Sequence, residues 1–563
     1  MSDTIINSFD IWTDAQGVKS KGRVKSIENI SLDGVLRLRE LIFELALRGK
    51  LVSQDPNDEP ASELLKNIIK EKAELTKKGM PKRGIIPEIS DQEKPFKLPE
   101  NWHWVRLGQI IQISSGDGLT ASQMSYNGNI PVFGGNGING YHDKANVTKP
   151  TLVIGRVGFY CGSVHITPNL AWVTDNAFIT CFSENNIDLS FLSLLLKGTN
   201  LKENDSATAQ PVISGRKVYP IVVALPPFAE QKRIIAKVGE LMVFCDRLEQ
   251  KKNKNLRTHQ VLVETLLETL KKASDANDLQ KAWQRISSHF ETLFCTEDSI
   301  EQLKQTILQL AIMGRLVKQN PNDEPASDLL KKIEKEKVKL VNEGKLKKEK
   351  PLPIITEEEK PFAIPKCWEW VRLGTITNKI GSGSTPRGGN NAYSDAGIIF
   401  LRSQNIRNEG VLLEDVAYID AEINKKMSNT VVLPNDILLN ITGGSLGRSA
   451  VFPDNLKVAN VSQHVTIIRP TITASSSFLH KSILSPYIQD LIWGRQIGAN
   501  REGLSKKVLE LFEIPYPPIA EQTRIVEKVD ELMILCDSLK SRINKSQEIQ
   551  GLLSKTIIEN AIT

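Results

Sequence analysis

Three stretches of this chain occur twice, in the same order. Gly49–Leu64 (GKLVSQDPNDEPASEL) returns at Gly314–Leu329 (GRLVKQNPNDEPASDL), with 12 of 16 positions identical. Two further pairs follow: Glu93–Gly108 with Glu359–Gly374, identical at 11 of 16 positions, and Pro226–Glu249 with Pro517–Lys540, identical at 15 of 24. An internal repeat restricts the fold before any other pattern does. The repeats predict one holder that is built twice.

The segments enclosed by these repeats do not recur. Residues 109–225 (insert 1) and 375–516 (insert 2) differ by 25 residues in length and share little sequence. Each insert has Gly- and Asn-rich turns between short β-branched runs, which is typical of compact α+β domains with exposed loops. A holder with two different inserts fits a protein that must read two different things at a fixed separation.

Composition sets few further limits. The 563 residues suffice for three or four domains, and 72 Lys and Arg stand against 66 Asp and Glu, a net charge of +6. This balance permits nucleic-acid binding without demanding it. The six cysteines show no C-x-x-C motif, which favours small buried hydrophobes over zinc ligands or disulfides. The start MSDTIINSFDIW lacks signal-peptide features, and no run approaches a membrane span, so we expect a soluble cytoplasmic protein.

The repeated segments carry helix signals. Apolar residues recur at helical spacing from Leu36 to about Arg48, and Gly49 takes the position after the helix end. Asp58 and Pro60 are typical of the start of a second, highly charged helix. The expected domains are an arm at 1–35, a helical region and connector at 36–98, an insert domain at 99–228, a spacer helix at 229–272, a linker with the second helical region at 273–360, an insert domain at 361–518 and a distal helix at 519–563.

A long helix follows each double proline. Spacings of four and three residues place Ile525, Val529, Leu532 and Cys536 on one narrow apolar stripe, as a and d positions do. The first copy, from about 229 to 271, would be on the order of 60 Å long at ~1.5 Å per residue. A narrow stripe needs a partner helix, and the duplicate is the nearest candidate. The alternative is that each helix packs only on its own domain.

These features together resemble the specificity subunit of type I restriction–modification systems. The resemblance is carried by the A-E-Q-x-R-I signature behind Pro-Pro (Ala229–Ile234, Ala520–Ile525), the W-x-W-V-R-L-G starts (Trp102–Gly108, Trp368–Gly374) and the NITGGSLGRSA stretch (Asn440–Ala450). It implies an α+β fold with two target recognition domains, separated by long helices that form an antiparallel coiled-coil-like pair with a pseudo-two-fold internal repeat.

The resemblance also implies partners. The expected ones are double-stranded DNA, two methyltransferase (modification) subunits and restriction/translocase subunits in a bacterial or archaeal cytoplasm. S-adenosylmethionine, ATP and Mg are expected in those partner subunits and not in this chain. For partner binding and the spacer we expect the repeated helix residues Glu230, Gln231, Arg233, Leu241, Leu248, Glu521, Gln522, Arg524, Leu532 and Leu539.

Candidate DNA contacts are Arg, Lys, Asn, Gln, Ser and His residues near glycine turns in the inserts. Such side chains contact base edges and phosphates. Insert 1 offers Asn136, Asn139, Lys144, Lys149, Arg156, Asn176, Gln210, Ser214, Arg216 and Lys217. Insert 2 offers Arg387, Arg402, Gln404, Asn405, Arg407, Arg448, Gln463, His464, Asn500, Arg501, Lys506 and Lys507. Arg156 and Arg448 rank highest because each lies beside glycines that allow close backbone approach.

Catalytic patterns are weak. Gly443–Gly447 matches G-x-S-x-G around Ser445, but the expected helix does not follow it, and a tight loop is the simpler interpretation. There is no G-x-x-x-x-G-K-[ST] loop and no metal-ligand spacing among the seven histidines. The paired tryptophans recur identically, which favours packing in the holder over base stacking. The lysine-rich runs Lys66–Lys78 and Lys331–Lys350 are simplest as solvated helix faces.

Three hypotheses therefore stand. The first is a DNA-binding specificity subunit without catalytic activity of its own, which directs an adenine methyltransferase and an ATP-dependent nuclease to a split, asymmetric site. The second is a helical scaffold whose two divergent inserts bind proteins and have no DNA specificity. The third is an enzyme that uses Ser445.

Overall fold

The structure is a computed structural model that divides into two compact units. It describes residues 12, 17–18, 30–77, 87–125, 127–158, 160–202, 212–274, 276–348, 350–388, 392–495 and 503–562. Unit 1 comprises Met1–Arg257 and Ser546–Thr563, and unit 2 comprises Thr258–Lys545. Most of the arm expected at 1–35 lies outside the described residues, as do the candidates Gln210, Asn500 and Arg501.

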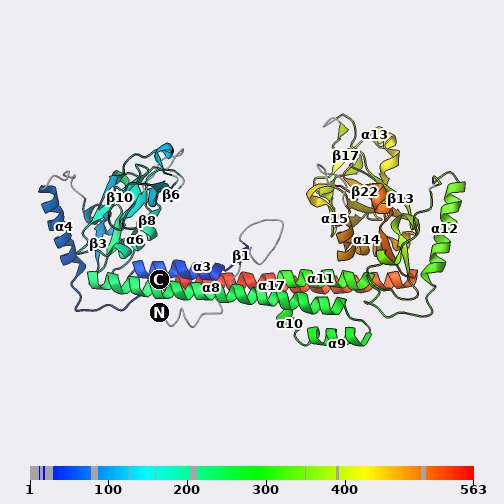
Figure 1. Cartoon of the computed structure of the whole chain (residues 1–563), viewed down its shortest axis with the longest axis horizontal. Coiled ribbons are helices and arrows are strands. Elements are labelled where there is room, and N and C mark those ends of the chain that lie inside the picture. The colour runs from blue at the N-terminus through cyan, green and yellow to red at the C-terminus, as the bar shows by residue number, and fades with distance from the viewer. Residues whose placement is uncertain are drawn as a thin grey trace. The chain divides into compact units, whose positions relative to one another are not determined.

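In each unit, one shorter helix packs with one part of each of the two long helices (Figure 1). In unit 1 they are α3 (Asp33–Leu47), the first part of α8 (Phe228–Lys271) and the last part of α17 (Ile519–Ile562). In unit 2 they are α11 (Glu297–Ile312), the last part of α8 and the first part of α17. The two long helices thus contribute to both units, and each unit holds the same set of parts.

Contacts in unit 1 fix the helix directions. On α3, Arg39 bonds to Asp246 of α8 at 2.7 Å, and beyond its end Gln54 bonds to Glu230 at 2.7 Å, so α3 and α8 run antiparallel. On the other side, Arg37 donates to the Gly551 carbonyl and Lys50 to the Ile562 carbonyl. Because α3 is therefore parallel to α17, α8 and α17 are antiparallel in this unit.

Unit 2 repeats the pattern with the long helices exchanged. Lys304 of α11 pairs with Asp537 and Lys540 pairs with Glu297, so α11 runs against α17. Toward the other end of α11, Arg315 donates to the Lys271 carbonyl at 2.8 Å. The expected antiparallel pairing is thus confirmed within each unit. The alternative, in which each helix packs only on its own domain, is wrong.

The apolar stripes of the long helices are buried where they meet. Ile234, Leu241 and Cys245 of α8 share a core with Leu38 and Leu45, against which Ile558 of α17 packs. In unit 2 the corresponding core contains Val263, Leu267, Ile525, Val529 and Cys536 together with Ile300 and Leu303 of α11. The apolar stripe of each long helix is covered by two partner helices and not by a broad domain surface, which accounts for its narrow width.

Each insert is closed by a two-stranded sheet that joins the holder to the end of the insert. In copy 1, β3 (His103–Arg106) pairs antiparallel with β11 (Val222–Leu225). In copy 2, β12 (Glu369–Arg372) pairs with β23 (Glu513–Tyr516). The holder strand before an insert therefore bonds to the last strand of that insert, and the long helix begins after the double proline that follows.

The two inserts share a common arrangement of strands despite their different sequences, to which insert 2 adds further strands. Insert 1 has a sheet in the order β4-β10-β7-β8, and insert 2 has one in the order β13-β22-β19-β20, antiparallel throughout. A second sheet has the order β6-β5-β9 in insert 1 and β17-β14-β21-β18 in insert 2, with one parallel pair in each. The α+β class is confirmed, and the inserts are two versions of one fold.

The strands and remaining helices have the following bounds. The strands are β1 (Gly17–Val18), β2 (Ile30–Ser31), β4 (Ile111–Ser115), β5 (Ile130–Gly134), β6 (Gly137–His142), β7 (Leu152–Gly155), β8 (Val164–Ile166), β9 (Trp172–Val173), β10 (Ala177–Phe182), β13 (Thr377–Ser382), β14 (Ile398–Leu401), β15 (Ile406–Arg407), β16 (Gly410–Val411), β17 (Ala417–Ile419), β18 (Val431–Val432), β19 (Ile437–Asn440), β20 (Ser449–Val451), β21 (Ala459–Val461) and β22 (Val465–Pro470). The helices are α4 (Ala61–Lys77), α5 (Leu107–Ile110), α6 (Leu189–Gly198), α7 (Gly215–Val218), α9 (Ala276–Ser287), α10 (Phe290–Leu293), α12 (Ala326–Asn342), α13 (Ala421–Lys426), α14 (Ser476–Leu484), α15 (Pro486–Gly494) and α16 (Lys506–Glu510).

The expectation for the cysteines holds in part. Cys161, Cys245 and Cys536 are buried as small hydrophobes, whereas Cys367 is half-buried and Cys181 and Cys295 are exposed. None of the helices within the described ranges is long and apolar enough to cross a membrane.

Candidate nucleic-acid interface

The three repeated motifs meet at one joint in each copy. In copy 1, the Trp102 indole Nε1 donates to Glu230 Oε2 at 2.9 Å, and Gln54 donates to the other carboxylate oxygen at 2.7 Å. One helical turn further along α8, Arg233 forms a bidentate ion pair with the Asp58 carboxylate, and the shorter of its two contacts is 2.6 Å. Gln54 and Asp58 come from the first repeated stretch, Trp102 from the second, and Glu230 and Arg233 from the third. These contacts explain why all three stretches recur together.

Copy 2 has the same joint. Trp368 donates to Glu521 at 3.0 Å, Gln319 donates to the same carboxylate at 2.6 Å, and Arg524 pairs with Asp323. Glu230 and Glu521 are fully buried, and burial raises the pKa of both carboxyl groups, against the lowering effect of the tryptophan and glutamine donors. A buried carboxylate with fixed donors holds its neighbours in one geometry.

This joint corrects part of the expected partner-binding set. Gln231 and Gln522 are buried and donate to the carbonyls of Pro226 and Pro517, so like the two glutamates they cannot contact a partner. The leucines Leu241 and Leu248 are buried in the unit 1 core, while Leu532 and Leu539 pack on the unit 2 core. The signature therefore couples each insert to its long helix. Within this set the side chains of Arg233 and Arg524 are 36% and 34% exposed, and Leu532 and Leu539 are half-buried.

A second repeated contact fastens α4 and α12 to the inserts. The Lys72 ammonium donates to the carbonyls of Gly108, Gln109 and Ile111 at 2.8–3.1 Å, and Lys337 donates to those of Gly374 and Thr375. These lysines depart from the expectation of solvated faces, which does hold for exposed Lys66 and Lys331. The clue in the sequence was the repeat itself, because Lys72 and Lys337 occupy the same register.

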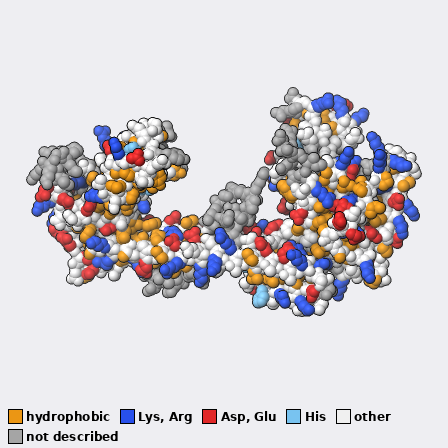
Figure 2. Space-filling model, viewed as in Figure 1, with side chains coloured by type: hydrophobic (Ala, Val, Ile, Leu, Met, Phe, Trp, Pro, Cys, Tyr) orange, Lys and Arg blue, Asp and Glu red, His pale blue; other side chains and the backbone are white. Residues whose placement is uncertain are grey.

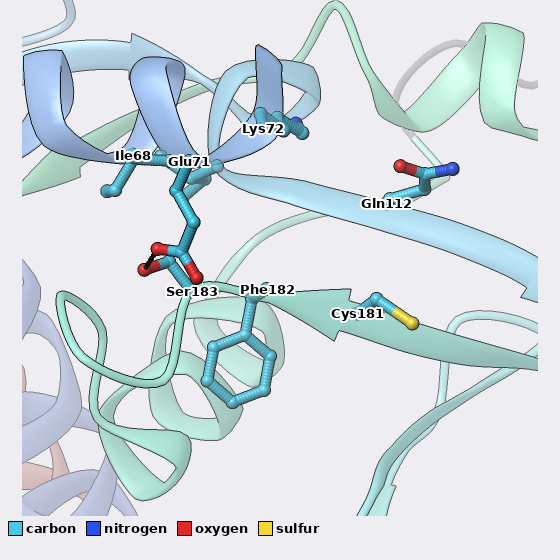
Figure 3. A pocket seen from close by; sticks show the side chains of 8 residues that line it. Ile68, Glu71, Lys72, Gln112, Cys181, Phe182 and Ser183 are labelled. Carbon is cyan, nitrogen blue, oxygen red and sulfur yellow. Dashed lines mark hydrogen bonds between the residues drawn. The ribbon is translucent and has the colours of Figure 1, made fainter. Parts of the chain in front are cut away.

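Beside Lys72 lies a small pocket between α4 and the first sheet of insert 1. Figure 3 shows Glu71 of α4 pointing toward Ser183, to which it is hydrogen-bonded, with Phe182 and Cys181 on the neighbouring strand. The pocket measures about 50 Å³, room for one or two waters. It is a small gap in the packing between the helix and the sheet, and not a ligand site.

A hairpin turn rich in glycine joins β7 to β8 in insert 1; we call residues 155–163 the glycine turn. Its ends are tied by bonds from the Gly155 amide to the Ser163 carbonyl and from the Gly162 amide back to Gly155, both 2.8 Å. Gly158 and Gly162 have φ of 87° and 85°, a region that disfavours side chains. The turn is thus set by two glycines, four residues apart.

Insert 2 has the same glycine turn at residues 440–448. The Asn440 amide bonds to the Arg448 carbonyl at 2.8 Å, and Gly447 bonds back to Asn440 at 3.0 Å. Gly443 and Gly447 have φ of 68° and 83°. Residue by residue, 155–163 matches 440–448, although the two glycines alone are identical. The same four-residue glycine spacing was the signal in the sequence that could have revealed this equivalence.

Neighbouring loops extend this surface equally in both inserts. The Arg156 amide donates to the Asn176 carbonyl at 2.9 Å, as the Ile441 amide donates to the His464 carbonyl at 3.0 Å. Gly116 directly follows β4, and Gly383 directly follows the equivalent strand β13. A Cβ would lie 2.3 Å from a carbonyl oxygen at Gly116 and 2.0 Å from one at Gly383. We call the glycine turn and these adjoining exposed loops the turn surface.

The turn surface gathers several of the residues expected to bind DNA in insert 1. Exposed Asn136 and Asn176 and half-buried Arg156 lie on it, and exposed Tyr160 joins them without having been expected from the sequence. Other candidates lie elsewhere: Asn139 on β6, exposed Lys144 in the loop after it, and Lys149 in an exposed ion pair with Glu184. Ser214 is the N-cap of α7, which carries Arg216 and Lys217, and the Lys217 ammonium donates to the Val212 carbonyl.

Insert 2 places Arg448, Gln463, His464 and Gln404 on its turn surface. Asn405 is withdrawn from the candidates: it is 1% exposed, accepts the Arg402 amide and donates to the Leu412 carbonyl. Arg402 is held by the Asp415 carbonyl at 2.6 Å. The other candidates lie off this surface or beside it: Arg387 in the loop after β13, Arg407 at the end of β15, and Lys506 and Lys507 on α16.

Ser445 lies inside the glycine turn, at the position of Tyr160 in insert 1. A nucleophile elbow joins a strand to a helix, whereas this turn joins the antiparallel strands β19 and β20. His464 is hydrogen-bonded to Thr442 and not to Ser445. The G-x-S-x-G match is therefore the glycine spacing of a hairpin.

Charge alone does not mark an interface. Figure 2 shows Lys and Arg side chains interspersed with Asp and Glu on the visible face of both units. Within the described ranges no group of His, Cys, Asp or Glu could hold a metal ion. What distinguishes the turn surface is one backbone that presents different polar side chains in the two inserts.

Comparison with known proteins agrees with this arrangement. The family model described as "Type I restriction modification DNA specificity domain" matches residues 99–258 and 365–549, once in each copy. The specificity subunit of the type I restriction enzyme EcoAI of Escherichia coli is 37% identical over 99% of both chains, and that of EcoEI, also of Escherichia coli, is 35% identical over 99% of both. Residues 36–98 and 302–360, which precede the two matched ranges and lie outside both, are thus within the length shared with these relatives.

Among solved structures, one of a type I R-M system, described for its complex assembly and conformational transition, covers 83% of this chain and 99% of its own. It is 17% identical, with a TM-score of 0.47.

Proposed function

Because this chain belongs to the family of type I restriction–modification specificity subunits, we propose that it binds double-stranded DNA at a split, asymmetric site and docks the methyltransferase subunits of its complex. Insert 1 reads one half of the site and insert 2 the other. The chain itself carries no catalytic residues. S-adenosylmethionine, ATP and Mg are used by the modification and restriction subunits, in a cytoplasmic, DNA-associated complex.

One observation carries this proposal: the two inserts share a backbone but not the side chains on their turn surfaces. Arg156, Asn176 and Ser163 of insert 1 correspond to Ile441, His464 and Arg448 of insert 2. Sequence is read by side-chain contacts to base edges, so equal loops with unequal donors and acceptors suit two different half-sites. An asymmetric site follows.

Repeated exposed apolar residues support docking of one partner twice. Val243 on α8 and Ile534 on α17 occupy equivalent positions of the repeated helix and are 49% and 69% exposed. Exposed apolar side chains that recur in the holder, and not in the inserts, favour a common partner for both copies. A modification subunit present twice fits this requirement.

The test is methylation mapping by long-read sequencing of DNA from cells that express this chain with its methyltransferase subunit. We expect a split, asymmetric motif methylated on both strands, which disappears when this chain is deleted. Exchange of residues 109–225 for another insert should change one half of the motif only. Added turns in the 229–271 helix should widen the gap and keep both halves.

Two results would speak for the protein-binding scaffold instead. One is methylation that persists unchanged without this chain, and the other is an insert exchange that leaves the motif as it was. Methyl transfer by the purified chain alone would contradict the absence of catalysis.

A further inference from the structure

The glycine turn shows where each insert carries a guanidinium. In insert 1 an arginine stands at the second position of the turn, Arg156, and serine stands at the last, Ser163. In insert 2 the arrangement is reversed: Ile441 is second and Arg448 is last. The same rigid hairpin thus presents one arginine from either of its two ends.

Arg448 is held at its backbone, and its side chain is half-buried. Its amide donates to the Ser445 carbonyl at 3.2 Å and its carbonyl accepts from Asn440 at 2.8 Å. The preceding Gly447 has a positive φ of 83°, and its carbonyl accepts a hydrogen bond from Gln489 Nε2 at 3.0 Å. Among the described residues no hydrogen bond or ion pair involves the Arg448 guanidinium, whereas Arg372, Arg469, Arg495 and Arg524 of the same unit are all bound to carboxylates.

Arg156 is oriented from its own domain. Its Nη1 lies 3.4 Å from both Ser115 Oγ and the Asp175 carbonyl, and its guanidinium lies 5.4 Å from the centre of the Phe178 ring. These long contacts fix a direction and leave donors for a ligand. At the matching end of the turn, the Ser163 hydroxyl is bound inward to the Gly135 carbonyl at 2.7 Å.

A planar guanidinium on a fixed backbone suits one base in particular. Arginine donates two parallel bonds to O6 and N7 of guanine in the major groove, the commonest specific base contact, whereas phosphate contacts carry no sequence information. We propose that Arg156 and Arg448 each read one guanine, one in each half of the DNA site, from opposite ends of equivalent glycine turns. This inference rests on the proposed function and names its base-reading residues.

The chain supplies its own matched variants. Arg448→Ser installs the residue that the turn of insert 1 has at that position, and Arg156→Ile installs the residue of insert 2, so both variants keep a turn that already folds in this protein. Arg448→Lys keeps a positive charge but cannot donate two parallel bonds. Arg285→Ser, on exposed α9, removes an arginine from outside both turn surfaces.

The experiment is competition binding by the complex of this chain with its modification subunits, using duplexes in which each base pair of the mapped site is substituted in turn. For Arg448→Ser and Arg448→Lys we expect the preference for one guanine in the half-site of insert 2 to fall on the order of tenfold to a hundredfold. All other positions should be unchanged. Arg156→Ile should do the same in the other half-site, and Arg285→Ser should change nothing.

Three results would overturn the inference: preferences that stay intact in the serine and isoleucine variants, equal weakening for all duplexes as a phosphate contact would give, or full preference in Arg448→Lys. If the wild-type complex shows a split motif in these cases, the proposed function stands and only the inference fails. A wild-type complex without preference at any position would refute both.

Discussion

Trp102 and Glu230 lie 128 residues apart in sequence and are joined by a buried hydrogen bond of 2.9 Å. The whole of insert 1 lies between these two residues in the chain. Trp368 and Glu521 repeat the bond at 3.0 Å around the second insert. The tryptophan precedes the strand that enters the insert, and the glutamate begins the long helix that leaves it. One bond therefore couples the orientation of each insert to its helix.

The first prediction concerns this bond. Trp102→Phe removes the indole donor and leaves a buried carboxylate oxygen of Glu230 without a partner, which costs about 1–3 kcal/mol. We expect faster hydrogen–deuterium exchange at the start of α8 and in β3, with unit 2 unaffected. Trp104→Phe is the control. Trp104 is half-buried and packs edge-on against Phe96, with the ring centres 4.9 Å apart. Equal effects of the two substitutions would contradict a special role for the bond.

The second prediction concerns pH. Two hydrogen bonds lower the pKa of Glu359 from its usual 4.5 to about 2. The bond from the backbone amide of Thr356 has the larger effect, and the bond from the Arg372 guanidinium has the next largest. A carboxyl group whose pKa is lower in the folded state stabilises that state above the unfolded pKa. This contribution is lost as pH falls through the folded value. Glu359→Gln should therefore lower stability at pH 7, with the difference from wild type shrinking between about pH 4.5 and 2.

Urea unfolding of both proteins across that pH range gives the measurement. Glu357→Gln is the matched control, since Glu357 is exposed and pairs only with Lys360 among the described residues. A difference for Glu359→Gln that is constant with pH would show that the ionised carboxylate is not what stabilises the fold.

The third prediction concerns the attachment of α4. Lys72→Met removes three bonds from the ammonium to the backbone carbonyls of Gly108, Gln109 and Ile111, where the first insert begins. We expect exchange of α4 amides to quicken by about tenfold, corresponding to ~1.4 kcal/mol. Lys66→Met on the same helix removes only an exposed pair with Glu63, worth less than ~1 kcal/mol, and should leave exchange as in wild type. Unchanged exchange in Lys72→Met would show that apolar packing alone holds the helix.

The fourth prediction concerns Ser445. Ser445→Ala removes a hydroxyl at the position that Tyr160 occupies in the other insert, inside a turn whose shape depends on Gly443 and Gly447. We expect the same methylation motif and the same amount of modified DNA as with the wild-type chain. Loss of any activity together with an intact motif would revive the interpretation of Ser445 as a nucleophile.

Several features were accessible from sequence because they depend on local chemistry. Helical spacing predicted α8 to within one residue and the end of α3 to within one residue, while α3 begins three residues before the expected Leu36. The glycine after α3 has a positive φ of 69°, as expected for Gly49. Identical tryptophans in both copies correctly indicated packing in the holder. The boundaries of the domains and the individual DNA contacts remain predictions.

Other features required the fold. Glu230 is a polar residue near a helix start, and nothing in the chain's pattern indicates that Trp102 and Gln54, distant in sequence, bond to it in the interior. Asn405 has the composition of a DNA contact, but its amide bonds inside its own loop. Burial of a polar side chain depends on its partners, and those partners are distant in sequence.

Three conclusions follow from the residues alone: one holder is built twice, long amphipathic helices follow each insert, and the chain resembles a family with two recognition domains. These conclusions rest on identity and periodicity, which are properties of neighbouring residues. The common fold of the inserts, with Arg156 and Arg448 at opposite ends of one turn, becomes apparent from contacts between distant residues. Backbone hydrogen bonds and glycine conformations define that turn, and they tolerate nearly any side chain, so two unlike sequences can close the same hairpin.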